Sequence, residues 1–128
     1  MIQHIKKFAP TALLLAATVF AATPVLAAGK FSLEDFMKKY HKAPKGTDPI
    51  CKKAGDGKAS KEQLAALLEG YAAMGAMKAP KGDEASWKQK NAALVAAVKD
   101  LQAGKAGAGA AYKTAVNCKA CHSAHKPD

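Results

Sequence analysis

The sequence predicts an all-α domain, folded as an antiparallel four-helix bundle whose first helix is interrupted. Three observations support this prediction. Apolar residues recur at helical spacing, and no segment shows sustained alternation of apolar and polar residues. Alanine is abundant while β-branched residues are scarce, which favours helices over strands. Capping and turn residues then divide the chain into four helical segments with short connections, which makes successive helices antiparallel.

The first predicted helix begins after Ser32, a favourable N-cap residue, and continues to about His41. Its apolar residues follow the i, i+3, i+4, i+7 spacing of one helix face: Leu33, Phe36, Met37 and Tyr40. Proline and glycine within residues 43–46 end this helix. Because a cap-like Thr-Asp-Pro run follows, a short turn of helix is expected over residues 51–54.

The next two helices are bounded by capping residues. The second begins at a capping box formed by Ser60 and Gln63, and its expected buried stripe comprises Leu64, Leu67, Leu68, Tyr71, Met74 and Met77. The third begins near Asp83 to Ser86 and ends at Gly104, a natural C-cap. Its expected inner face comprises Trp87, Leu94, Val95, Val98 and Leu101.

The fourth predicted helix, from about Lys105 to Ser123, carries the run Cys118-Lys119-Ala120-Cys121-His122. This C-x-x-C-H pattern is the attachment signature of a c-type haem. Thiols three residues apart lie side by side on one helix face, where they can add to the two vinyl groups of one porphyrin. His122 would then bind the iron as the proximal ligand. The motif predicts one covalent haem c per chain, attached through Cys118 and Cys121 near the end of the last helix.

Two other uses of the C-x-x-C pair are disfavoured. A structural zinc site needs four ligands, and only Cys51 and scattered histidines remain to complete one. A thioredoxin-like redox site needs a βαβ context, and the sequence has no strand pattern. Cys51 is expected to be a buried free thiol, with an intermolecular disulfide as the alternative.

Residues 1–27 are expected to form a secretory signal peptide, which leaves residues 28–128 as the haem-binding domain. A basic start (His4, Lys6 and Lys7) precedes an apolar run over residues 11–22, and residues 25–27 fit the cleavage rule near Ala27. The apolar run is too short to span a bilayer, so no membrane anchor is expected. In a bacterium this export leads to the periplasm, where haem is attached to such motifs.

The chain is strongly basic: its twenty basic residues are all lysine, against ten acidic residues, for a formal net charge of +10. A surface without arginine argues against sequence-specific reading of nucleic acid. It fits instead a positive surface that steers redox partner proteins with acidic surfaces. The alternative is that the lysines only keep an alanine-rich bundle in solution.

Two runs in the C-terminal half, Ser86-Trp87-Lys88-Gln89-Lys90 and Ala115-Val116-Asn117-Cys118-Lys119-Ala120-Cys121-His122, carry a family likeness. The segment from about Lys61 to His125 resembles the class II cytochromes c, the cytochrome c′ and cytochrome c-556 group. The resemblance implies an up-down-up-down bundle with haem near the end of the last helix. The chain departs from this family in its interrupted first helix. It also lacks the arginine that often lies near a haem propionate in that family, a position that Lys38 or Lys39 would fill.

The resemblance leaves the distal side of the iron open between two subclasses. The c-556 type places a methionine of the first helix on the iron and transfers electrons, whereas the c′ type leaves the iron five-coordinate and binds NO or CO. Met37, on the apolar face of the first helix, is the predicted distal ligand, with an ordinary core methionine as the alternative. His41, four residues later, is the alternative ligand; otherwise it is a surface histidine at a helix end. His125 is expected to be exposed to solvent.

The predicted function is therefore that of a periplasmic c-type cytochrome that carries single electrons through a haem with Met/His ligation. The alternative is cytochrome c′-like binding of NO or CO at a five-coordinate iron. No Ser/His/Asp or Cys/His catalytic set, paired catalytic carboxylates or phosphate loop is recognisable, so an enzyme is not predicted. A peroxidase-like activity, with His41 as the acid/base, is a third possibility. Both a monomer and a homodimer remain open.

Overall fold

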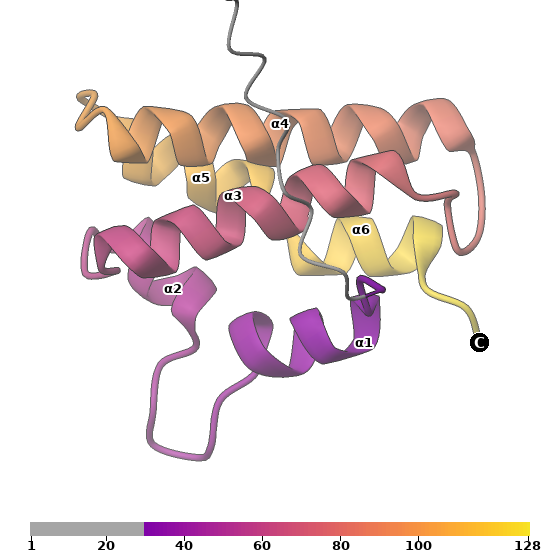
Figure 1. Cartoon of the computed structure of the whole chain (residues 1–128), viewed down its shortest axis with the longest axis horizontal. Helices are drawn as coiled ribbons and strands as arrows, with labels where there is room; N and C mark the ends of the chain where they lie inside the picture. The colour runs from indigo at the N-terminus through magenta and orange to yellow at the C-terminus, as the bar shows by residue number, and fades with distance from the viewer. Residues whose placement is uncertain (1–29) are drawn as a thin grey trace, which may run out of the picture.

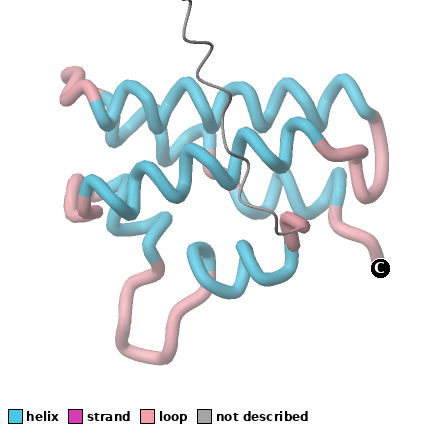
Figure 2. The backbone as a smooth tube through the Cα atoms, in the orientation of Figure 1, coloured by secondary structure: helices cyan, strands magenta, loops and turns pink. Residues whose placement is uncertain are grey.

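Residues 30–128 are described by the computed structural model, and all regular structure within them is helical (Figures 1 and 2). The predicted all-α class is confirmed for this part of the chain. The predicted signal peptide, residues 1–27, lies outside the described residues. None of the helices in this range is both long enough and apolar enough to cross a membrane.

The first helix has two consecutive parts, α1 (Leu33–Phe36) and η1 (Met37–His41), of which η1 is a π-helical turn. Ser32 caps α1 as predicted, because its hydroxyl oxygen accepts a hydrogen bond from the backbone N–H of Asp35 at 3.2 Å. A π-helical turn is rare and frequently occurs at functional sites. It is also wider than an α turn, so the first and last residues of η1 are directed to the same side of the helix.

The interruption after this helix is present. A loop of residues 42–49 separates η1 from α2 (Ile50–Gly55), and Figure 2 shows it as an extended excursion between the two helices. The residue before α2 is Pro49, which has extended backbone and removes an N–H that a helix start would leave unpaired. Cys51 and Ala54 of α2 are buried in the core.

The helix α3 (Lys61–Ala76) begins at the predicted capping box. The backbone N–H of Gln63 donates to the Ser60 hydroxyl at 3.1 Å, and the backbone N–H of Ser60 donates to the Gln63 side chain at 3.0 Å. Three members of the predicted stripe are almost completely buried: Leu67, Tyr71 and Met74. Gly70 in the same helix leaves room for the Phe36 ring, which occupies the position a Cβ atom would take.

The helix α4 (Glu84–Gln102) is capped by Asp83, whose carboxylate accepts a hydrogen bond from the backbone N–H of Ser86 at 2.7 Å. Trp87, Leu94 and Val98 are buried on its inner face as predicted. The indole N–H of Trp87 donates to the carbonyl oxygen of Met74 at 2.8 Å, which ties α4 to the end of α3.

The prediction of one continuous fourth helix is wrong. The chain forms α5 (Ala108–Ala115) and a separate α6 (Cys118–His125). The side chain of Asn117 accepts a hydrogen bond from the backbone N–H of Ala120 at 3.1 Å and so caps a new helix. Asparagine competes for backbone hydrogen bonds in this way, which is why it favours caps over helix interiors. The C-x-x-C-H motif therefore begins α6 rather than continuing α5.

The helices alternate in direction along the chain (Figure 1): α1 and η1 run opposite to α3, α3 runs opposite to α4, and α5 and α6 return behind them. One hydrophobic core joins α1, α2, α3, α4 and α5, and comprises Phe36, Cys51, Ala54, Leu67, Tyr71, Met74, Trp87, Leu94, Ala97, Val98 and Tyr112. Among the apolar residues of α6, Cys121 packs at the margin of this core. The helix α6 stands beside the core, and the space between them forms the candidate site.

Candidate functional site

Two cavities lie between α6 and the helices α1–η1, α3 and α4. Their volumes are about 550 Å³ and about 410 Å³. Both volumes fall in the range of about 300–1,000 Å³ that is typical of small-molecule and cofactor sites. The two cavities adjoin, because the same side chains line both of them: Met37, Lys42, Met74, Cys121 and His122. Together they form one hollow along the side of α6.

The residues of the predicted attachment motif line this hollow. Cys118 and Cys121 are the first and fourth residues of α6, so their side chains lie one helical turn apart on the same face. Both thiols are free, and both border the smaller cavity. His122 is exposed and borders both cavities. The structure thus brings the three motif residues to one accessible surface that faces the core.

The thiols differ in their surroundings. Cys118 is exposed, and its Sγ lies 3.3 Å from the carbonyl oxygen of Val116. Cys121 is partly buried, and this burial raises the pKa of its thiol, while the positive charge of Lys90 acts in the opposite direction. A nearby lysine favours the thiolate, which is the reactive form of cysteine.

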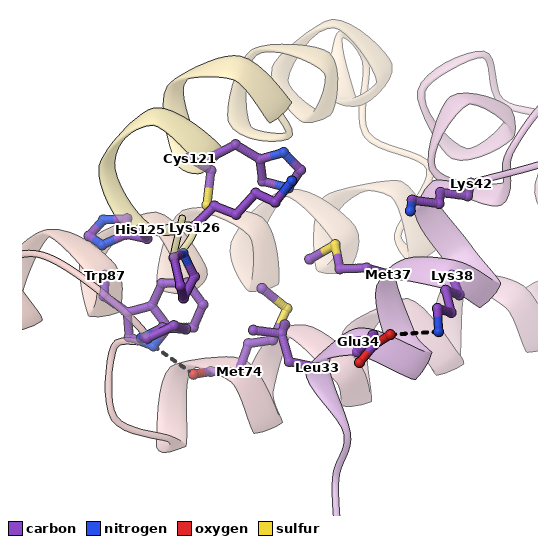
Figure 3. Close-up of a pocket in the computed structure, with 13 residues that line it drawn as sticks. Leu33, Glu34, Met37, Lys38, Lys42, Met74, Trp87, Cys121, His125 and Lys126 are labelled. Atoms are coloured by element: carbon purple, nitrogen blue, oxygen red, sulfur yellow. Dashed lines mark hydrogen bonds and ion pairs between the residues drawn. The ribbon is translucent and has the colours of Figure 1, made fainter.

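Met37, the predicted distal ligand, lies at the start of η1 and across the hollow from α6. Figure 3 shows its side chain directed from η1 into the larger cavity, toward the side where Cys121 lies. The structure therefore brings Met37 and His122 together on the walls of the same two cavities. An apolar thioether at this place is consistent with either an iron ligand or a packing residue.

A second methionine, Met74, also lies at the hollow, although its place on the buried stripe of the helix predicted only a core residue. It is almost completely buried, and it also borders both cavities (Figure 3). Its position three residues after Tyr71 on the buried stripe of α3 was visible in the sequence. That spacing does not reveal that the core ends in a hollow at this point, because the hollow is formed by helices far apart in the chain.

His41, the alternative ligand, borders the smaller cavity but not the larger one. It is partly buried, so the interpretation as a surface histidine is wrong. Its Nε2 atom lies 3.1 Å from the hydroxyl of Tyr71, which in turn lies 2.6 Å from the hydroxyl of Tyr112. Burial lowers the pKa of His41 to about 4, and the nearby His122 contributes in the same direction. His41 is therefore a neutral imidazole near neutral pH.

His125 is buried, with 2% of its surface exposed, so the prediction of a solvent-exposed side chain is wrong. Its Nδ1 lies 2.8 Å from the carbonyl oxygen of Lys81, and its Nε2 lies 3.2 Å from the hydroxyl of Ser86. The imidazole also packs edge-on against the Trp87 ring, with the ring centroids 5.4 Å apart. His125 lies one helical turn after His122, so these contacts fix the part of α6 that presents the predicted iron ligand.

Lysine side chains surround the opening of the hollow. Lys38, Lys42 and Lys126 border the larger cavity, and Figure 3 shows Lys38 in an ion pair with Glu34. Lys39 instead places its ammonium group over the Tyr40 ring, 5.3 Å from the centroid, and borders neither cavity. Of the two lysines considered for contact with a haem propionate, only Lys38 lies at the cavity.

Cys51 is buried in the core, as predicted, and is a free thiol in this structure. Burial raises the pKa of its thiol, and the negative charge of a Cys118 thiolate nearby would raise this pKa further. Within residues 30–128, no group of three or more histidine, cysteine, aspartate or glutamate residues is placed to hold a metal ion.

No family model, curated protein or solved structure was found to match the chain.

Proposed function

We propose that the protein is a c-type cytochrome that carries single electrons through one covalently bound haem c. The observation that carries this proposal is the set of residues shared by the two cavities, since it contains both His122 and Met37. A porphyrin that occupied both cavities would have its iron near the residues that border both. The proximal ligand expected from the motif and the distal ligand expected from the first helix both belong to this shared set.

The residues at the hollow fit such a group. Cys118 and Cys121 would form the thioether bonds, because their thiols are free and share one face of α6. His122 is exposed toward the hollow and would bind the iron. Leu33, Met74 and Trp87 supply apolar walls to the larger cavity, against which the apolar faces of a porphyrin could pack. When bound, the haem supplies an iron that cycles between the Fe(II) and Fe(III) states.

Met37 is a better candidate than His41 for the distal position. Met37 borders both cavities, whereas His41 borders only the smaller one. The Nε2 of His41 is also within hydrogen-bonding distance of the Tyr71 hydroxyl, while a thioether has no comparable competing partner. Ligation by Met37 and His122 would raise the reduction potential relative to a bis-histidine haem. This ligation favours an electron carrier.

The surroundings of the hollow are consistent with docking of a redox partner. Lys42 and Lys126 border the larger cavity, and Lys90 borders the smaller one. The full chain has a formal net charge of +10, of which Lys6 and Lys7 in the proposed signal peptide contribute +2. Such a surface would attract partner proteins with acidic surfaces and orient them toward the haem edge, with a rate of association that falls as salt is added.

The arrangement of the helices supports a four-helix bundle of the class II type as the architecture of this cytochrome. The four helical segments of the bundle would be α1–η1 with α2, then α3, then α4, and finally α5 with α6. Their directions alternate along the chain.

We further propose that residues 1–27 direct export to the periplasm, where haem would be attached to the C-x-x-C-H motif.

Expression of the full chain in a bacterium that exports and matures c-type cytochromes tests the proposal. Covalent haem c keeps its absorption with the polypeptide after denaturation and acid–acetone extraction, whereas a loosely bound haem is extracted. We expect one haem per chain in the wild type and none in the Cys118→Ser/Cys121→Ser variant. The Cys51→Ser variant is the matched control and should retain its haem. Extraction of all haem from the wild type would contradict the proposal.

The alternative function is capture of NO or CO at a five-coordinate iron. It is distinguished by adding CO to the ferrous protein. Prompt formation of a CO spectrum without denaturation would favour the gas-binding function, and an unchanged spectrum favours the six-coordinate electron carrier.

A further inference from the structure

Three side chains from distant parts of the chain form a hydrogen-bonded row beside the smaller cavity. His41 comes from η1, Tyr71 from α3 and Tyr112 from α5. The His41 Nε2 lies 3.1 Å from the Tyr71 hydroxyl, and the two hydroxyl groups lie 2.6 Å apart. Both tyrosines are fully buried, with 0% of their surface exposed. Burial raises the pKa of both phenols, so both stay protonated.

This row makes the Nε2 atom of His41 unavailable as a ligand in either tautomer. If Nε2 accepts the Tyr71 proton, its lone pair is used in that hydrogen bond. If Nε2 carries the proton and donates it to Tyr71, it has no free lone pair. The Nδ1 atom is closer to the His41 backbone and is more hindered for approach to a haem iron. His41 must therefore break its bond to Tyr71 before it can bind iron.

Breaking that bond is unfavourable because Tyr71 is buried. Its hydroxyl would keep the Tyr112 hydroxyl as a partner but lose the second one, at a side chain with none of its surface exposed. The ring of His41 is also held by packing, since it lies edge-on to the Tyr71 ring with the centroids 5.7 Å apart and edge-on to the Phe36 ring at 5.5 Å. The Met37 side chain is not held in this way. Its thioether sulfur is only a weak hydrogen-bond acceptor, so no strong hydrogen bond has to break before the sulfur binds iron.

Met37 and His41 are both placed to compete for an iron bound at the smaller cavity. They are the first and last residues of the π-helical turn η1, and both border the smaller cavity together with His122. We propose that Tyr71 selects the distal ligand: by holding the imidazole of His41 against α3, it leaves the iron to Met37. This inference rests on the proposed haem function. Tyr71 is a positioning residue that acts on His41, the competing ligand, and not on Met37.

The test compares haem-loaded proteins by two readouts, the ferric Met–iron charge-transfer band and the reduction potential. In Tyr71→Phe, His41 is released, so we expect loss of the band and a lower potential, because imidazole replaces the thioether. In the double variant Tyr71→Phe/His41→Leu, the competitor is absent and the band should return. Tyr112→Phe is the matched control: it removes a buried hydroxyl but leaves the Tyr71–His41 bond, so the band should persist.

Three outcomes would overturn the selection by Tyr71. The first is a Tyr71→Phe protein with the wild-type band and potential. The second is a wild-type protein that is already bis-histidine. The third is a double variant in which the band stays absent, since its loss would then not come from His41. A wild-type protein that acquires no haem contradicts the proposed function instead. In that case ¹⁵N–¹H correlation of the His41 ring tests the restraint directly, and ring signals that Tyr71→Phe leaves unchanged would overturn it.

Discussion

The Nδ1 atom of His125 lies 2.8 Å from the carbonyl oxygen of Lys81, which joins the end of α6 to the connection between α3 and α4. A carbonyl oxygen can only accept, so Nδ1 carries a proton; in the neutral imidazole, Nε2 then accepts from the Ser86 hydroxyl. The adjacent Gly82 has a φ of +80°, and a Cβ atom there would lie only 2.5 Å from the carbonyl oxygen of Ala124. The glycine therefore permits the close approach of α6.

Replacing His125 should loosen α6. We expect His125→Ala to lower the free energy of unfolding by about 2–4 kcal/mol, because it removes a buried ring and leaves the Ser86 hydroxyl and Lys81 carbonyl without this partner. Urea denaturation measures the effect. Lys119→Ala, on the exposed side of the same helix, is the control and should change stability by less than about 0.5 kcal/mol. Equal effects of the two substitutions would contradict the role of His125 in fastening α6.

The contact between Gly70 and Phe36 predicts that a glycine-to-alanine substitution, which usually stabilises a helix, destabilises the protein at this position. Glycine to alanine inside a helix usually stabilises by about 1 kcal/mol. At Gly70 the Phe36 ring occupies the space of the new Cβ, so Gly70→Ala should instead destabilise by about 1–3 kcal/mol through overpacking. Gly75→Ala in the same helix is the comparison, because its Cβ would approach Asn91 Cβ only to 3.3 Å. Thermal unfolding of the two variants gives the sign, and a stabilised Gly70→Ala protein would show that Phe36 is not held there.

The helix boundaries that depend on neighbouring residues were predictable, and the contacts between distant residues were not. The Ser60–Gln63 capping box is local, so its two side chains specify the start of α3 by themselves. The break before α6 was not predicted. Asn117 caps α6 through a local hydrogen bond, but an asparagine can also lie within a helix, and the choice between a cap and a continuing helix depends on where α6 packs.

The surroundings of His41 and His125 depend on tertiary contacts that leave no pattern in the sequence. The residues that bury His125 are about forty positions away, and Tyr71 is thirty positions from His41. The motif predicted that Cys118, Cys121 and His122 act together, because covalent haem chemistry needs that spacing, and the structure places all three at the smaller cavity. The attachment of haem there stays a prediction. Spacing alone does not choose between Met37 and His41, since the π-helical turn directs both to the same cavity.

Protonation of Asp56 should make the protein less stable in strong acid. Its carboxylate pairs with Lys113 at 2.7 Å and with Lys52 at 3.0 Å, and these partners lower the pKa of Asp56 from 3.8 to about 2. A carboxyl group whose pKa is lowered by folding contributes stability above the unfolded value, and this contribution is lost as the pH falls from about 3.8 through about 2.

The Asp56 contribution is measured by comparing urea denaturation of the wild type and Asp56→Asn at several pH values. We expect the variant to be less stable at pH 5 and the difference to shrink as the pH falls through about 2, because below that pH Asp56 becomes neutral like the asparagine. Asp48→Asn, which removes only a pair with Lys52 at 3.1 Å, is the control and should have the smaller effect. A stability difference between wild type and Asp56→Asn that is independent of pH would contradict the pairing.

The most direct test of the central claim is the ferric absorption spectrum of the exported, haem-loaded protein beside that of Met37→Ala. Ligation of iron by His122 and Met37 predicts a Met–iron charge-transfer band in the wild type and its absence in the variant. Met74→Leu, which alters the other methionine at the hollow, should retain the band. A wild-type spectrum without the band, or a Met37→Ala spectrum that keeps it, would remove Met37 from the iron and contradict the account.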